Sequence, residues 1–67
     1  MYQVYETQIV YYTGKYDNTI ILLSEICEIE GLDPMTYDEM VQRYGEPMAK
    51  FYIDEALQLL RKEGKIR

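Results

Sequence analysis

The sequence contains no histidine and no tryptophan, and Cys27 is its one cysteine. Without histidine, Ser-His-Asp triads and histidine-containing zinc sites are excluded. One cysteine cannot close an internal disulfide, and a lone thiol is typical of a reducing compartment, where we expect Cys27 to be a small apolar residue of the core. There is no glycine-rich phosphate-binding loop either. We therefore expect a protein that is not an enzyme and that uses no cofactor, metal ion or small-molecule substrate.

Long apolar runs are also missing. The longest is Ile20–Leu23, whereas a membrane-spanning helix needs about 20 apolar residues. The first residues, MYQVYETQ, lack the basic and apolar regions of a signal peptide. We expect a cytoplasmic protein that does not interact with membranes.

The chain is short for a folded protein. Its 67 residues allow one domain, and a hydrophobic content of 48% excludes compositional disorder. A domain of this size buries only about 60% of its unfolded surface, so disulfides, metals or association usually add stability. Since the first two are missing, we expect a homodimer or a complex with a partner.

Basic residues are scarce in the first half of the chain. The net charge is −5, and residues 1–35 hold six of the twelve acids but one of the seven bases. Residues 36–67 hold equal numbers of acids and bases, and the last seven residues contain four bases. An acidic chain is repelled by nucleic acid at long range, whereas a locally basic segment can still contact phosphates.

Tyrosine, by contrast, is abundant near the N-terminus. Residues 2–13 are rich in Tyr, Val, Ile and Thr, which is strand composition. The segment fits either one long strand or a hairpin that turns near residues 6–8. Tyrosines either pack in the strands or form an interface, for which the candidates are Tyr2, Tyr5 and Tyr11.

Three helices are predicted after this segment. Residues 18–30 place Leu22, Ile26 and Ile29 on one face, with Asp17 or Asn18 as N-cap, Gly31 at the C-terminal end and the glutamates on a solvated face. The second helix begins with a capping box, Thr36 to Glu39, and runs to about Tyr44, where Gly45 ends it.

The third helix starts at Pro47 and ends before Gly64. Its buried face is predicted to consist of the apolar residues spaced three or four apart: Ala49, Ile53, Ala56, Leu57 and Leu60. The alternation in residues 65–67 predicts a short terminal strand.

The segment from Thr36 to Arg67 resembles the winged helix-turn-helix superfamily. The capped helix, the glycine turn, the apolar third helix and the step Gly64-Lys65-Ile66 stand where that family has its helix-turn-helix and the start of its wing. The fold this implies is α+β: one three-helix winged-helix-like domain over residues 1–67, with a tyrosine-rich N-terminal strand and a short C-terminal strand. Another α+β or helical packing is the alternative.

The resemblance implies a small DNA-binding protein, a transcriptional regulator acting as a dimer. Two departures weigh against it: only residues 65–67 are available for a wing, and Asp54 and Glu55 on the third helix would face phosphates. The residues expected to contact DNA are Arg43, Lys50, Gln58, Lys62, Lys65 and Arg67.

The alternative function is an acidic protein-interaction module, or an inhibitor that imitates phosphate charge and covers the groove of a nucleic-acid-binding partner. Besides the tyrosines, Met48 and Phe51 are candidates for its interface, since both lie opposite the apolar stripe of the third helix. Packing of Phe51 under the acidic N-terminal segment is the competing interpretation.

Overall fold

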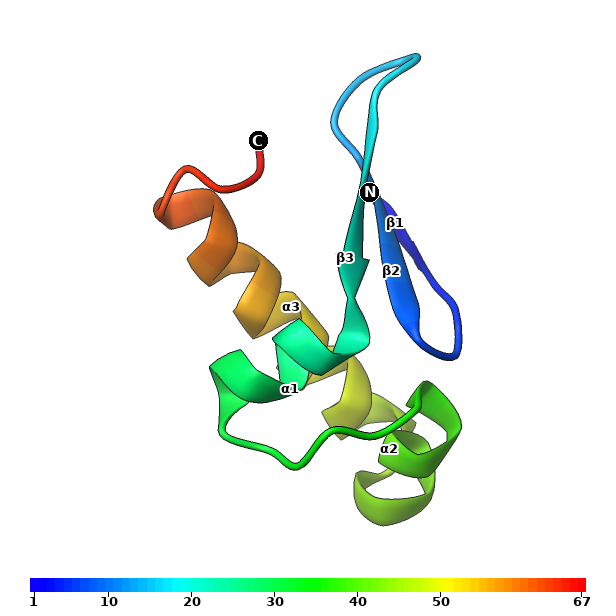
Figure 1. Cartoon of the computed structure of the whole chain (residues 1–67). Coiled ribbons are helices and arrows are strands. Elements are labelled where there is room, and N and C mark those ends of the chain that lie inside the picture. The colour runs from blue at the N-terminus through cyan, green and yellow to red at the C-terminus, as the bar shows by residue number, and fades with distance from the viewer.

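The computed structural model describes residues 1–67 as a three-stranded antiparallel sheet followed by three helices (Figure 1). The predicted α+β class is confirmed. The elements are β1 (Tyr2–Val4), β2 (Gln8–Tyr12), β3 (Asn18–Leu22), α1 (Leu23–Glu30), α2 (Tyr37–Tyr44) and α3 (Glu46–Lys62). The strands lie in the order β1-β2-β3, so β1 and β3 are both edge strands.

The tyrosine-rich segment is a hairpin rather than one strand. The Tyr5 N–H donates to the Gln8 carbonyl at 2.8 Å, which leaves Glu6 and Thr7 as a two-residue turn. The pairs Tyr2–Tyr11 and Val4–Ile9 then set the register between β1 and β2.

The predicted start of the first helix is wrong. Residues 18–22 form β3, which pairs along its whole length with β2, and α1 begins only at Leu23. The run Thr19-Ile20-Ile21 is β-branched, and such side chains favour a pleated strand. Neither Asp17 nor Asn18 caps the helix, because Leu22 is the N-cap and no side chain bonds there.

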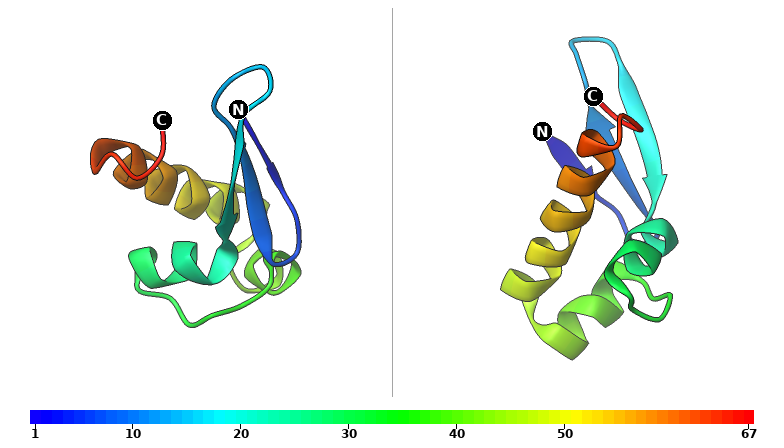
Figure 2. Two further views of the ribbon diagram at one scale, coloured as in Figure 1. Left: turned by 45° about the horizontal axis from the view of Figure 1, so that its top comes forward. Right: turned by 90° about the vertical axis from the view of Figure 1, so that its left-hand side faces the viewer.

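One face of the sheet is covered and the other is open. Ile9, Tyr11 and Ile21 point to the covered face and are buried. The helices α1 and α3 lie on this side, and α2 lies at the end of the sheet beside the turn between β1 and β2, as two views of the ribbon show (Figure 2). The opposite, outer face of the sheet has no layer of secondary structure above it.

The core forms where the covered face meets α3. The predicted apolar stripe of α3 is confirmed, since all five of its members are buried. Ile26 and Cys27 from α1 and Met40 from α2 are fully buried against it.

The predicted helix caps are confirmed at three positions. The Thr36 hydroxyl accepts the Glu39 N–H at 3.2 Å, and the Glu39 carboxylate accepts the Thr36 N–H at 3.1 Å. Gly31 and Gly64 follow α1 and α3 with φ of 73° and 77°, the left-handed conformation that glycine adopts without strain.

The winged-helix order and the C-terminal strand are wrong. All strands precede the helices, and no strand follows α3. After Gly64 the Lys65 N–H donates to the Leu60 carbonyl, which turns the chain back over the end of α3. Ile66 is then buried in the core instead of joining a sheet edge, and the Tyr11 hydroxyl donates to the Arg67 carbonyl at 2.9 Å.

None of the three helices has both the length and the apolar character that crossing a membrane requires.

The capping box makes a prediction for stability. We expect Thr36→Ala to lower the free energy of unfolding by about 1 kcal/mol, because the Glu39 N–H loses its acceptor. Thr36→Ser keeps the hydroxyl and is the control. Denaturant unfolding of both variants measures the difference, and equal stability of the two would contradict a capping role.

Candidate functional site

The residues expected to contact DNA are scattered, and three of their cations face carboxylates. Arg43 Nη2 lies 4.0 Å from Glu39 on α2, Lys50 Nζ lies 3.4 Å from Glu46 on α3, and Lys65 Nζ lies 3.7 Å from Glu63. Such exposed pairs add little stability, but each places a negative charge beside a cation meant for phosphate.

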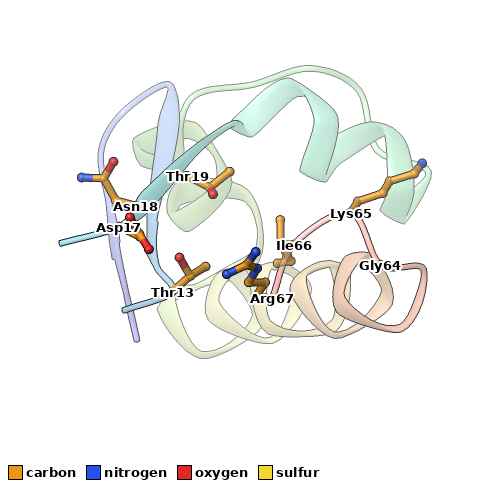
Figure 3. A pocket seen from close by; sticks show the side chains of 8 residues that line it. All are labelled: Thr13, Asp17, Asn18, Thr19, Gly64, Lys65, Ile66 and Arg67. Atoms are coloured by element: carbon orange, nitrogen blue, oxygen red, sulfur yellow. The ribbon is translucent and has the colours of Figure 1, made fainter. Parts of the chain in front are cut away.

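The remaining members of that set do not converge either. Gln58 and Lys62 line a hollow between α1 and α3 that also contains Glu30 and Glu55. Arg67 lies at a polar hollow beside Thr13, whereas the side chain of Lys65 extends away from it towards α1 (Figure 3). The structure therefore brings no continuous basic face together.

Acidic side chains, in contrast, do gather. Two adjoining hollows between α1 and α3 share Ile29 and Leu59. Five glutamates line them: Glu25, Glu28, Glu30, Glu55 and Glu63. We call these seven side chains the α1–α3 surface. Two bases line the same hollows: Lys62 in the one with Glu30 and Glu55, and Lys65, which pairs with Glu63, in the other.

Two of these glutamates form a like-charged pair across the helices. Partial burial of Glu30 raises the pKa of its carboxyl, and the hydrogen bond and negative charge of Glu55 raise it further. Both effects disfavour a second negative charge at this point. A cation placed between the two carboxylates would relieve the repulsion.

Met48 and Phe51 are exposed, as the alternative hypothesis requires. Phe51 is 52% exposed and does not pack under the N-terminal segment, and its ring contacts Tyr52 edge-on with centroids 6.3 Å apart. Tyr44 from α2 packs against the same Tyr52 ring at 5.3 Å. Phe51 precedes Glu55 by one helical turn, so this aromatic cluster continues the α1–α3 surface along α3.

The three candidate tyrosines have different surroundings. Tyr2 donates its hydroxyl to Asp54 on α3, and burial together with that carboxylate raises the pKa of the phenol. Tyr11 is only 6% exposed, so its ring belongs to the core and not to a free surface. Tyr5 is half exposed and lies on the outer sheet face, where its hydroxyl donates to Gln3.

The outer sheet face is the surface that sequence reasoning missed. Ile20 and Leu22 are 59% and 51% exposed on it, because β3 is a strand and not part of a helix. No charged residue lies on this face, which consists of Gln3, Tyr5, Gln8, Val10, Tyr12, Asn18, Ile20 and Leu22. The one signal in the sequence was composition, since QIVYY and NTIIL are rich in β-branched and aromatic residues but do not alternate between apolar and polar.

Comparison of the chain with protein-family models, with curated proteins and with solved structures gives no match. No group of three His, Cys, Asp or Glu side chains is arranged to hold a metal ion. The candidate site therefore has to be judged from its geometry and charge.

The glutamate pair makes a prediction for pH dependence. Because the folded-state pKa of Glu30 is raised, this carboxyl contributes stability below its unfolded pKa, and the contribution is lost as pH rises through the folded value. Relative to the wild type, Glu30→Gln should therefore gain stability as pH rises from about 4, the unfolded pKa of a glutamate, through the raised folded pKa.

Unfolding free energies measured over that pH range test this expectation. Glu25→Gln removes the same charge from α1 without touching the pair, so its stability difference should change less with pH. A Glu30→Gln curve parallel to the wild-type curve would show that the two carboxylates do not interact.

Proposed function

We propose that this chain is an acidic protein-interaction module that binds a basic segment of a partner protein on the α1–α3 surface. The observation that carries the proposal is the gathering of five glutamates around two apolar side chains, with Glu30 beside Glu55.

Apolar contact provides the first part of the binding energy. Leu59 is 43% exposed between the acidic side chains, and Phe51 lies two turns earlier on α3. Exposed apolar side chains with a charged rim are typical of protein contact sites, since burying them on association is favourable. A partner helix or extended segment with apolar residues at its centre fits this pattern.

Charge provides the second part of the binding energy and makes the surface selective for basic partners. A lysine or arginine of the partner placed between Glu30 and Glu55 would form charge-assisted hydrogen bonds and remove the repulsion of the pair. The net charge of −5 also raises the association rate with a basic protein, and salt weakens this effect. Basic grooves that bind nucleic acid belong to this class of partner.

The proposal predicts selective, salt-sensitive capture. Immobilised wild-type protein should retain a basic protein from the extract of its own cells at low salt and release it at about 0.5 M salt, where charges are strongly screened. The double variant Glu30→Gln/Glu55→Gln and the variant Leu59→Asp should each retain at least about tenfold less.

Tyr16→Ala is the matched control, because Tyr16 is an exposed aromatic residue in the loop between β2 and β3, outside the α1–α3 surface. It should bind like the wild type. Retention of the same proteins in the same amounts by all four baits would overturn the proposal.

DNA binding is the second candidate. The observation that favours it is the position of Arg61, Lys62, Lys65 and Arg67, four of the seven bases, at the C-terminal end of α3. The short α2–Gly45–α3 connection keeps two helices in contact, although without a wing. The negative end of the α3 dipole and Glu63 oppose phosphate binding there.

Fluorescence anisotropy with a mixed-sequence duplex at about 50 and 200 mM salt separates the two candidates. A protein-interaction module gives no anisotropy change at either salt concentration. Binding that weakens steeply with salt and is lost in Arg61→Gln/Lys62→Gln would favour DNA binding instead.

A further inference from the structure

The outer edge of β3 has unpaired backbone groups. The Thr13 N–H donates to the Asp17 carbonyl, and the Leu23 N–H donates to the Thr7 carbonyl. In an antiparallel ladder every second residue bonds to the neighbouring strand, so these two bonds determine which residues of β3 bond to β2. Residues 19 and 21 therefore bond to β2, whereas the N–H and C=O of Asn18 and Ile20 point away from the sheet. No strand lies on that side.

We infer that this edge pairs with β3 of a second copy of the chain, antiparallel and centred on Ile20, so that two three-stranded sheets become one six-stranded sheet. Ile20 would then exchange both backbone hydrogen bonds with Ile20 of the other copy. Asn18 of each copy would lie opposite Leu22 of the other. This surface shares only Glu25, in the first turn of α1, with the α1–α3 surface, which lies on the helical side of the sheet.

The side chains of β3 favour pairing with a second copy of the chain. Edge strands that remain unpaired usually carry lysine, proline or a bulge, and β3 has none of these protections over its five residues. Its only outward side chains are Asn18, Ile20 and Leu22, and two of them are exposed aliphatic residues. Pairing would place the two Ile20 side chains next to each other on the outer face, where they pack as a cross-strand pair.

In the antiparallel arrangement Lys15 of each copy would lie beside Glu25 of the other. Lys15, the one base of the first half of the chain, shares the loop before β3 with Asp17, and Glu25 lies in the first turn of α1 after β3. An antiparallel partner brings the loop of each copy beside the start of α1 of the other. A parallel partner would instead place like charges together.

The first experiment measures association. Sedimentation equilibrium should show a dimer for the wild type and at least about tenfold weaker association for Ile20→Lys, because the charge would lie at the centre of the new pairing. Tyr5→Lys is the control: it adds the same charge to the outer face at the distant β1 side and should remain dimeric. A monomeric wild type, or equal loss in both variants, would overturn the inference.

The second experiment tests the register. Under mild oxidation, Ile20→Cys should form an intermolecular disulfide with itself, since the paired Cα atoms would lie about 5.5 Å apart. Leu22→Cys should cross-link to Asn18→Cys in a mixture but not to itself. Wild-type protein is the control for Cys27, which is buried. Self-linking of Leu22→Cys as efficient as that of Ile20→Cys would contradict the proposed register.

The sedimentation and cross-linking tests do not depend on whether the protein captures a basic partner. Ile20→Lys leaves the α1–α3 surface intact and should still bind the basic partner as a monomer. Capture without dimerisation would refute only the strand pairing, and dimerisation without capture would refute only the proposed function.

Discussion

The turn between β1 and β2 holds the sheet and the helices in one arrangement. The carbonyl of Thr7 accepts the first N–H of α1, from Leu23, at 2.9 Å. The carbonyl of Glu6 accepts the first N–H of α2, from Tyr37, at 2.9 Å, and the Glu6 carboxylate accepts the next one, from Asp38. Helix N-termini leave such N–H groups without intrahelical partners, and a carboxylate there also interacts favourably with the helix dipole. Two residues of a hairpin thus satisfy the starts of two helices, which explains why β3 can run directly into α1 without a side-chain cap.

This attachment makes the sheet one-sided. The helices α1 and α2 both begin at this turn, α1 and α3 cover one face of the sheet, and α2 packs against α3 at the end of the sheet. The contacts of Tyr2 with Asp54 and of Tyr11 with the Arg67 carbonyl fasten the opposite end of the sheet to α3. None of the three helices covers the outer face, and Ile20 and Leu22 are exposed on it.

Local signals in the sequence predicted the helical part of the fold well. Spacing alone was sufficient for the capping box, the two C-terminal glycines and the buried stripe of α3, because each depends on residues within a few positions of one another: Thr36 with Glu39, Gly31, Gly64 and the stripe residues.

The boundary between β3 and α1 at Leu22 could not be predicted from local spacing. Residues 19–23 satisfy helical and strand periodicity equally, and only pairing of β3 with Gln8–Tyr12, whose residues lie 6 to 14 positions before their partners, decides between them. The prediction of a C-terminal strand is wrong for the same reason. Ile66 is buried in the core, and the residues that form this core cannot be identified from the local sequence. The exposure of Met48 and Phe51 could be predicted from helical geometry. The proximity of Glu30 and Glu55 could not, because these residues lie on different helices, α1 and α3.

The distribution of charge over the two faces separates two kinds of contact. A like-charged surface such as the one around Glu30 and Glu55 repels its own copy, so it selects a partner of opposite charge. The strand β3 itself carries no charge, so the binding energy of its edge comes mainly from directional backbone hydrogen bonds and matched side chains. For a chain of net charge −5, self-association is favoured where the local charge is low, and the edge strand β3, which has no charged residue, provides such a place. A dimer built there would present two acidic surfaces on the same side of one continuous sheet, and a partner with two basic segments would bind both with an avidity that neither surface has alone.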